Sequence, residues 1–267
     1  MDRPDWVPDD VDMSVPNVAR VYDAALGGTH NLPVDREMLL QAQKLFPAVA
    51  DFAFDNRAFL GRAVRWLAAR GVRQFLDIGS GIPAIGNVHE IARVVAPDAR
   101  VAYVDVDPVA VRHGQQILAD DPGAVFVRGD LRQPDDILAD PAVAGLLDLS
   151  APVGVLLCAV LHFLPDSDDP AGLVARLRDR LAPGSHVAIS HGTRVEEFDA
   201  APMDEIGGLY RRTTMPFFVR SRAEVTAMLD GWELLPPGVV PIGDWHPELG
   251  DAVRPQPAIL GAVARRS

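Results

Sequence analysis

The 267-residue sequence has one cysteine and no apolar run long enough to span a membrane. With Cys158 alone, an intramolecular disulfide is excluded and a cysteine-based zinc site is not expected. The longest uncharged run, Leu149 to Leu164, is shorter than the roughly 20 residues that a membrane span needs. The acidic start MDRPDWVPDD lacks the basic and apolar regions of a signal peptide. We therefore expect a cytoplasmic protein with no membrane partner.

Positive charge is also scarce. The chain has 25 lysines and arginines against 37 aspartates and glutamates, which gives a net charge of −12. A chain this acidic repels phosphate backbones, so no nucleic-acid partner is expected. Apolar residues make up 48% of the sequence, enough for a sizeable core in one enlarged α/β domain or in a core with a helical addition. The oligomeric state stays open.

The first 71 residues contain no strong strand pattern. Residues 1–15 are rich in aspartate with little apolar periodicity, which predicts a loose arm. Residues 16–71 show apolar side chains at helical spacing, with Gly27 and Gly28 ending the first helix and Gly71 the last. This segment is predicted to form a helical cap.

Strand and helix patterns alternate from Gln74 onward, which predicts βαβ units and a mostly parallel sheet. The predicted strands are Phe75–Ile78, Val101–Val104, Ala124–Val127, Val153–Cys158, His186–Ile189, Trp232–Leu235 and Ala258–Val263. The core is thus expected to span 72–267, with an insertion at about 192–220 that shapes a pocket.

The clearest motif is Phe75-Leu76-Asp77-Ile78-Gly79-Ser80-Gly81, a buried strand that runs into a glycine turn. Gly79 and Gly81 allow a tight turn and close approach of a ligand. Asp105 ends the next strand, where a carboxylate can accept both hydroxyls of a ribose. Asp130 follows the third strand and can accept from an adenine amino group. A nucleoside cofactor is expected at this sheet edge.

Asp77 favours one nucleoside cofactor over another. A dinucleotide would bring its diphosphate to the glycine turn, where a carboxylate is repulsive. S-adenosylmethionine brings an ammonium and a sulfonium, which a carboxylate attracts. Gly79-x-Gly81-x-x-Ala84 also fits the loose dinucleotide pattern, so an NAD(P)-binding oxidoreductase remains an alternative, and Asp77 could instead only tie down the loop.

The segments FLDIGSG, VDVDP, RGDL, LHFLPD and LAPGSHVAIS resemble the successive motifs of class I methyltransferases. More narrowly, VARVYDAALGGTHN, DREMLL, NVHEIA and PPGVVPIGDWHP resemble an S-adenosyl methyltransferase family long catalogued as a domain of unknown function. The resemblance implies a Rossmann-like α/β fold of seven strands, the last antiparallel, and S-adenosyl-L-methionine as methyl donor. It leaves the acceptor, and O-, N- or C-methylation, undefined.

The resemblance also implies roles for residues at matching positions. Four residues of the glycine turn should hold the methionine end of the donor: Asp77, Gly79, Ser80 and Gly81. Asp105 should hold the ribose, with Val106 against the adenine face and Asp130 and Leu131 at the adenine edge. Ala159 and Val160, after the fourth strand, should pass near the amino-acid part of the donor.

Candidates for catalysis and for acceptor binding are less sharply marked. His162 could be a general base, or it could only pack at a strand end. Methyl transfer from a sulfonium can also proceed through alignment without a base. Tyr22, His30, Asn31, His191 and Trp245 are candidates for the acceptor pocket or for a lid, and each has an alternative as a core or turn residue. Asp166–Asp169 could suggest a metal, but helix capping explains it better, so no metal is expected.

The sequence therefore predicts a methyltransferase that acts on a small or medium-sized molecule. A non-catalytic binder or sensor of S-adenosylmethionine is a further alternative, because a fold does not prove turnover.

Overall fold

In the computed structural model, residues 3–84, 86–193, 201–250 and 258–267 are described. Their strands form one eight-stranded sheet in the order β3-β2-β1-β4-β5-β8-β6, with β7 also paired to β8. Strands β1 to β5 are parallel, and β8 runs antiparallel to β5, β6 and β7. The bounds are β1 Gln74–Ile78, β2 Arg100–Asp105, β3 Ala124–Arg128, β4 Gly154–Cys158, β5 His186–Gly192, β6 Glu233–Leu234, β7 Val240–Pro241 and β8 Ile259–Arg265.

The predicted class of fold is confirmed, and the number of strands was wrong by one. Two short strands, β6 and β7, pair with β8 in the region where the sequence predicted one, Trp232–Leu235. Strand β7 has two residues, one of them Pro241, which cannot donate to a ladder and so gives no strand pattern.

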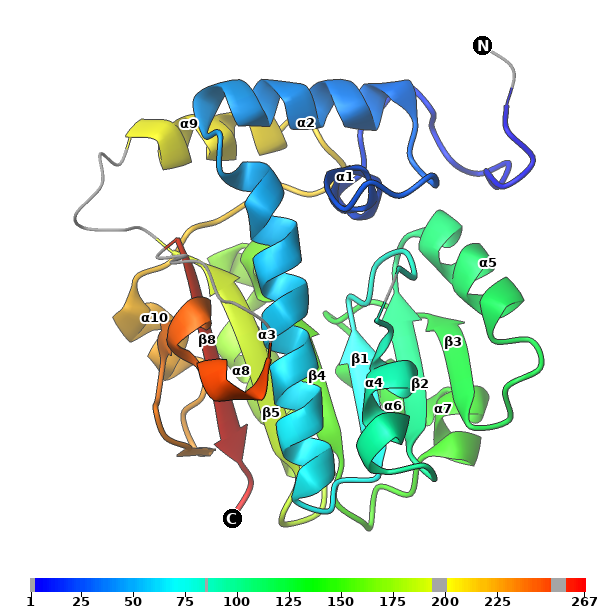
Figure 1. Ribbon diagram of the computed structural model, residues 1–267, viewed down its shortest axis with the longest axis vertical. Helices are drawn as coiled ribbons and strands as arrows, with labels where there is room; N and C mark the ends of the chain where they lie inside the picture. Colours follow the sequence, from blue (N-terminus) through cyan, green and yellow to red (C-terminus); the bar gives the residue numbers. More distant parts are fainter. Residues whose placement is uncertain (1–2, 85, 194–200, 251–257) are drawn as a thin grey trace.

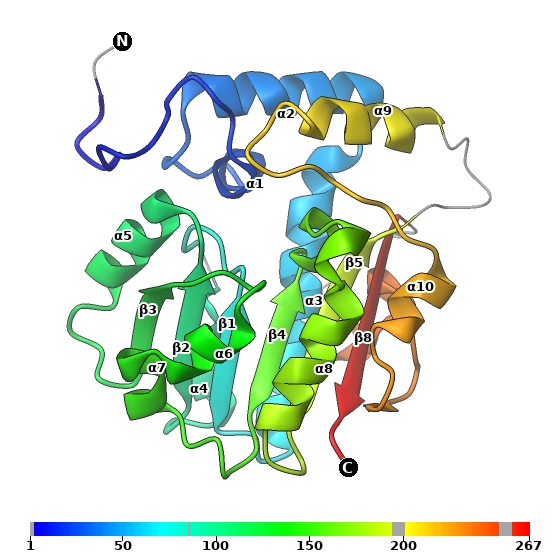
Figure 2. The same cartoon turned by 180° about the vertical axis from the view of Figure 1, so that it is seen from behind.

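Helices cover both faces of the sheet (Figures 1 and 2). One face packs against α3 (Val49–Ala69), α4 (Val88–Val95) and α5 (Pro108–Ile117). The other packs against α6 (Pro134–Ala139), α7 (Pro141–Leu146), α8 (Pro170–Arg180) and α10 (Arg222–Ala227). Every residue of β1 and β4 is buried, as expected for strands covered on both sides. The sheet is thus rigid where its carboxyl ends carry the site.

Helix α3 places the amino-terminal helices over that edge. Its 21 residues span roughly 31 Å, longer than the neighbouring strands. It begins above the carboxyl ends of the parallel strands and descends along the sheet to β1 (Figure 1). Helices α1 (Val18–Ala25) and α2 (Pro33–Leu45) therefore lie above the sheet edge, with α9 (Ala201–Tyr210) beside α2.

A buried ion pair fastens α1 to α2. Arg20 Nε donates to Asp35 Oδ2 at 2.9 Å, and both side chains are almost completely buried. Asp35 also accepts from the backbone N–H groups of Asn17 and Leu32. Removing one partner of such a pair typically costs about 3–5 kcal/mol because a buried charge is left alone. The two helices should therefore move as one unit.

The amino-terminal arm is not loose, contrary to the sequence prediction. Within its described part, Val7 and Val11 are buried in the core, and Trp6 packs edge-on against His30 with ring centroids 5.3 Å apart. Three apolar side chains without helical periodicity suffice to anchor a segment that has no regular structure.

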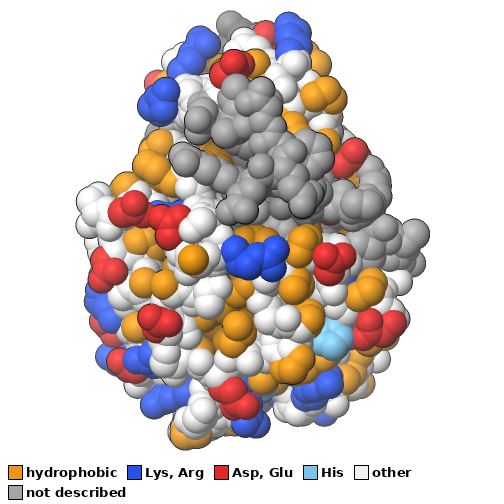
Figure 3. Space-filling view, turned by 90° about the vertical axis from the view of Figure 1, so that its left-hand side faces the viewer, with side chains coloured by type: hydrophobic (Ala, Val, Ile, Leu, Met, Phe, Trp, Pro, Cys, Tyr) orange, Lys and Arg blue, Asp and Glu red, His pale blue; other side chains and the backbone are white. Residues whose placement is uncertain are grey.

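The surface seen in Figure 3 carries acidic and basic side chains interspersed with apolar ones, and on its described part neither sign gathers into a patch. Within the described ranges, no helix has both the length and the apolar character to cross a bilayer.

Candidate functional site

A cavity of about 430 Å³ lies between the carboxyl ends of β1 to β4 and helix α1. Its lining includes all ten residues that the sequence assigned to a cofactor: Asp77, Gly79, Ser80, Gly81, Asp105, Val106, Asp130, Leu131, Ala159 and Val160. These ten line what we call the polar half. Ten further lining residues form what we call the apolar half: Val18, Tyr22, Leu39, Phe46, Phe52, His162, Phe163, Tyr210, Met215 and Phe217. The lining also includes the charged residues Arg57, Asp107, Arg132 and Asp168.

The glycine turn after β1 requires glycine at two positions for different reasons. Gly79 and Gly81 have φ of +74° and +69°, which side chains rarely adopt. A Cβ on Gly79 would lie 2.5 Å from Val160 Cγ2, so this residue is needed for close packing. A Cβ on Gly81 would meet no protein atom within 4 Å. Gly81 therefore keeps space open in the cavity itself.

Two buried carboxylates flank this turn. Asp105 Oδ2 accepts from the Gly81 N–H at 2.8 Å, and Oδ1 accepts from the Asp107 N–H at 2.8 Å. Asp77 is 4% exposed, and no group among the described residues donates a hydrogen bond to its carboxylate. Burial raises the pKa of Asp77 to about 7, against the opposing effect of the Arg57 guanidinium. Burial likewise raises the pKa of Asp105 to about 6.

An unsatisfied carboxylate in a cavity is best compensated by a cation with hydrogen-bond donors. The ammonium of an amino acid supplies both, whereas a diphosphate would add repulsion. The open space at Gly81 and the Asp77 carboxylate therefore fit the amino-acid end of S-adenosylmethionine.

A hydrogen-bond chain that the sequence gave no sign of connects the strand ends to α1. The Ala159 N–H donates to Ser190 Oγ at 2.8 Å, and that hydroxyl donates to Asn56 Oδ1 at 2.5 Å. Asn56 Nδ2 then donates to the Tyr22 hydroxyl at 3.0 Å, which donates to the Ala53 carbonyl at 2.9 Å. The chain fixes the loop after β4, where Ala159 has a φ of 58°, and holds Tyr22 in the cavity wall.

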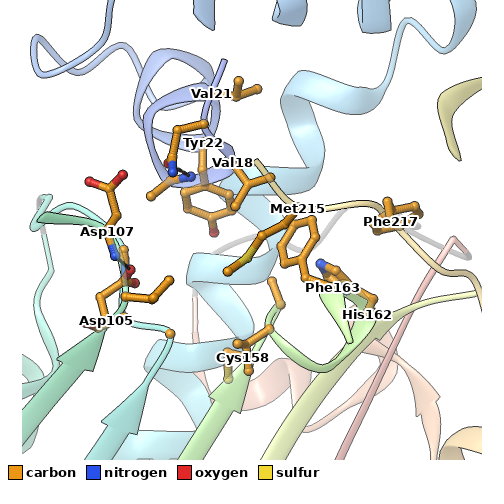
Figure 4. A pocket seen from close by; sticks show the side chains of 18 of the residues that line it. Val18, Val21, Tyr22, Asp105, Asp107, Cys158, His162, Phe163, Met215 and Phe217 are labelled. Atoms are coloured by element: carbon orange, nitrogen blue, oxygen red, sulfur yellow. Dashed lines mark hydrogen bonds between the residues drawn. The ribbon is translucent and has the colours of Figure 1, made fainter. Parts of the chain in front are cut away.

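The apolar half is dominated by rings, as Figure 4 shows. The Asp105 and Asp107 side chains lie on one side of the view, and Met215, Phe163, His162 and Phe217 lie on the other. The Phe163 and Tyr210 ring planes are 29° apart at a centroid distance of 6.3 Å, and Tyr210 lies 5.5 Å from Phe217. These rings come from η1 (Leu161–Phe163) and from residues 210–217, inside the expected insertion. Residues 194–200 of that insertion lie outside the described residues.

His162 lines the cavity and is 2% exposed. Its Nδ1 accepts from the Gly192 N–H at 3.2 Å, which leaves the proton of a neutral ring on Nε2. Burial, with His191 and Arg220 nearby, holds the pKa of His162 well below its usual range. A neutral ring whose lone pair is already engaged is a hydrogen-bond donor toward the cavity. The general-base interpretation is therefore not favoured by this geometry.

Two acceptor-pocket candidates lie outside the cavity lining. His191 is fully buried: its Nδ1 donates to the Gly192 carbonyl at 2.7 Å and its Nε2 accepts from Arg220 at 3.1 Å. Trp245 is also fully buried and packs against Phe59 and Trp66 under α3. For both residues the structure favours the alternative as a core residue, because neither side chain lines the cavity.

The turn from Gly27 to Asn31 does not line the cavity either. Asn31 Nδ2 donates to Asp23 Oδ2 at 2.8 Å and to the Gly28 carbonyl, which makes it a turn-stabilising residue. His30 stacks on His113 of α5 with ring centroids 3.7 Å apart. The wall toward α1 is made instead by the preceding helix, through Val18, Val21 and Tyr22.

The acidic stretch Asp166–Asp169 has structural roles. Asp169 Oδ1 accepts from the Gly172 N–H at the start of α8. Asp166 pairs with Arg220 at 2.7 Å, and Arg220 also donates to the Leu161 and Leu164 carbonyls. This arginine fixes the loop that carries His162 and Phe163.

A parallel sheet with a glycine turn after β1 and buried carboxylates at the ends of β1 and β2 defines a class I methyltransferase core. The chain belongs to the S-adenosyl methyltransferase family, whose model matches residues 4–267. It is an S-adenosylmethionine-dependent methyltransferase, and S-adenosyl-L-methionine is its methyl donor. No curated protein matches the chain significantly in sequence.

Solved structures agree with this assignment. A candidate methyltransferase from Thermobifida fusca YX is 35% identical, with a TM-score of 0.91 over 99% of this chain and 100% of that one. A DUF574 family protein from Streptomyces avermitilis is 39% identical, with a TM-score of 0.89 over 96% of this chain and 99% of that one. Human N-acetylserotonin methyltransferase, solved with its methyl donor, shares the fold at 15% identity and a TM-score of 0.52, over 94% of this chain and 63% of that one.

Proposed function

We propose that this enzyme methylates a small or medium-sized molecule that binds in the apolar half of the cavity. The observation that carries the proposal is that one cavity has carboxylates on one part of its wall and rings on another. A cavity of this volume falls in the range of small-molecule sites. Because α1 forms part of its wall, a large folded acceptor is not expected to reach the donor.

In this proposal the polar half holds the donor. Asp77 pairs with the ammonium, while Gly79, Ser80 and Gly81 surround the rest of the amino-acid end. Asp105 accepts from the ribose hydroxyls.

The other strand ends complete the donor contacts. Val106 contacts the adenine face, and Asp130 and Leu131 meet its edge. Ala159 and Val160 approach the amino-acid part from β4. The contact between Val160 and Gly79 keeps these two loops in register.

S-adenosylmethionine supplies a methyl group on a positively charged sulfur. The protein contributes alignment and exclusion of water, which would otherwise compete as acceptor. Helix α1, fixed by the Arg20–Asp35 pair and the Tyr22–Asn56 hydrogen bond, covers the cavity. The ring-lined wall leaves few polar groups to hold water near the reacting atoms. His162 contributes a hydrogen-bond donor and takes up no proton.

The proposal is tested in two stages. Calorimetry should show one site for S-adenosylhomocysteine and no measurable binding of NAD or NADP. Incubation with S-adenosylmethionine and cell extract should then yield methylated small molecules detectable by mass spectrometry. Methylation confined to protein or nucleic acid would contradict the proposed acceptor class. Binding without any product would favour the sensor alternative.

A further inference from the structure

The apolar half contains no charged side chain among the described residues of its wall. The charged groups that line the cavity come from other residues: Arg57 on α3, Asp168 on η2 (Asp166–Asp168), and a set at or after the ends of β1 to β3, namely Asp77, Asp105, Asp107, Asp130 and Arg132. A carboxylate, phosphate or ammonium on the acceptor would therefore be desolvated without a partner, at a cost of several kcal/mol. The bound part of the acceptor must carry no such group.

The shape of this wall points to a flat molecule. The ring centroids of Phe163, Tyr210 and Phe217 lie within 6.3 Å of one another. The Phe217 centroid is 4.7 Å from that of the His162 ring. All three rings line the cavity and are partly exposed to it. Offset or edge contacts between rings add to the stabilisation that burial alone gives. An aromatic acceptor gains from these contacts, whereas a saturated molecule of the same volume does not.

One polar group interrupts the apolar wall. The Nε2 atom of His162 has no hydrogen-bond partner among the described residues, and only 2% of the residue is exposed. The ring is held by the Gly192 N–H at Nδ1, so Nε2 presents an N–H. This N–H is available to donate a hydrogen bond to a ligand in the cavity.

We propose, on the basis of the function proposed above, that the acceptor is a phenol-type compound: an uncharged aromatic ring system whose hydroxyl oxygen accepts from His162 Nε2. Phenols suit this wall because no described side chain of the apolar half can take a proton. A phenol with a pKa of about 10 ionises far more readily than an aliphatic alcohol.

The phenol binds uncharged, and its hydroxyl proton passes to solvent as the oxygen attacks. The oxygen forms a bond to the methyl carbon as the carbon–sulfur bond of the donor breaks, and sulfur keeps that electron pair. The products are an aryl methyl ether and S-adenosylhomocysteine. His162 retains its proton throughout and stabilises the partial charge on the oxygen as the hydroxyl proton leaves.

The test compares four probes by calorimetry on the full chain saturated with S-adenosylhomocysteine. 2-Naphthol should bind, while decahydro-2-naphthol, its saturated counterpart, should bind at least about tenfold more weakly. 2-Methylnaphthalene, which replaces the hydroxyl with a methyl group, should bind about three- to tenfold more weakly than 2-naphthol. 2-Naphthoate should show no binding. Equal affinity of the saturated and aromatic alcohols, or tight binding of 2-naphthoate, would overturn the proposal.

His162→Asn gives the matched variant. Its side-chain oxygen can still accept from the Gly192 N–H, while the donor at Nε2 is lost. Affinity for 2-naphthol should fall about three- to tenfold, and affinity for 2-methylnaphthalene should stay unchanged. Equal losses for both probes would show that His162 only packs. If the variant does not fold, the comparison of the two probes on the native chain decides the question.

The same titrations separate this inference from the proposed function. Failure of S-adenosylhomocysteine to bind would contradict the function itself. Normal binding of S-adenosylhomocysteine with no preference for 2-naphthol would leave the function standing and reject the phenol-type acceptor.

Discussion

The two halves of the cavity are built by different means. The polar half uses consecutive strand ends of one rigid sheet, with backbone N–H groups and carboxylates held within a few residues of each strand. The apolar half is assembled from α1, α3, η1 and the 210–217 segment, which are far apart in the sequence. The polar half is thus set by the strand ends of the sheet itself, whereas the apolar half depends on contacts between segments that are distant in the sequence.

The largest loss of S-adenosylhomocysteine affinity should come from a side chain that fills part of the polar half. Gly81→Val places a side chain where no protein atom lies within 4 Å, so S-adenosylhomocysteine affinity should fall at least about 100-fold. Gly27→Val is the matched control, because Gly27 has a φ of +76°, equally open surroundings and no place in the cavity lining. Calorimetry on both variants measures the difference. Similar affinity losses in both would indicate backbone strain rather than a ligand site.

The next largest effect should be a dependence of S-adenosylhomocysteine affinity on pH. The Asp77 and Asp105 carboxylates, with pKa values of about 7 and 6, must ionise before they pair with an ammonium or accept from hydroxyls. We expect S-adenosylhomocysteine affinity to rise roughly tenfold between pH 5.5 and pH 8. Asp77→Asn should weaken binding at pH 8 and flatten this dependence. A flat profile in the native chain would show that neither group meets the ligand.

The same groups set the pH dependence of the unliganded fold. Their folded pKa values lie above the ordinary value near 4, so the folded state binds extra protons between about pH 4 and pH 7. Their contribution to stability is fully present below this window and is lost as pH rises through it. The thermal shift caused by S-adenosylhomocysteine should therefore be larger at pH 8 than at pH 5.5.

A smaller and more selective effect is expected in the apolar half. Phe217→Leu keeps an apolar side chain but removes the ring that contacts Tyr210 and His162. Affinity for 2-naphthol should fall about two- to tenfold, and affinity for S-adenosylhomocysteine should change less than about twofold. Both are measured by calorimetry. A large loss of S-adenosylhomocysteine affinity would show that the two halves do not bind their ligands independently.

The smallest effect should come from the hydrogen-bond chain between the halves. Tyr22→Phe removes the hydroxyl that joins Asn56 to the Ala53 carbonyl, and should lower the free energy of unfolding by about 1 kcal/mol. Affinities for both ligands should change less than about threefold. Denaturant unfolding measures the free energy of unfolding, and calorimetry measures the two affinities. A tenfold change in either affinity would show that Tyr22 is a ligand contact.

The sequence predicted that the residues of the polar half lie together, because they are close to consecutive strand ends. Asp77 lies near the end of β1, and Gly79 and Gly81 follow within four positions. Asp105 ends β2, and Asp130 follows β3. Parallel strands bring such positions to one edge without further information. The fold class and the three amino-terminal helices were predictable for the same reason, since apolar periodicity is a local property.

The residues of the apolar half could not be predicted from local sequence patterns. Whether a ring after a strand meets the cavity depends on the direction of its side chain and on distant partners. Phe163 and Phe217 line the cavity, whereas Trp245 and His191 are buried elsewhere. The hydrogen-bond chain through Asn56 and Ser190 joins residues 134 positions apart, which no motif records. Likewise, the span of α3, which carries α1 over the sheet edge, follows from packing rather than from any single residue.

If the polar half is the methyl-donor site, replacing Asp105 should weaken binding of the donor's product. S-adenosylhomocysteine should be titrated at pH 8 into the native chain and into Asp105→Ala, with thermal unfolding of both to show that the variant is folded. The account predicts one site in the native chain and at least a tenfold loss of affinity in the variant, because each lost charge-assisted hydrogen bond costs about 1.5–3 kcal/mol. Unchanged affinity in a folded Asp105→Ala variant would contradict the account.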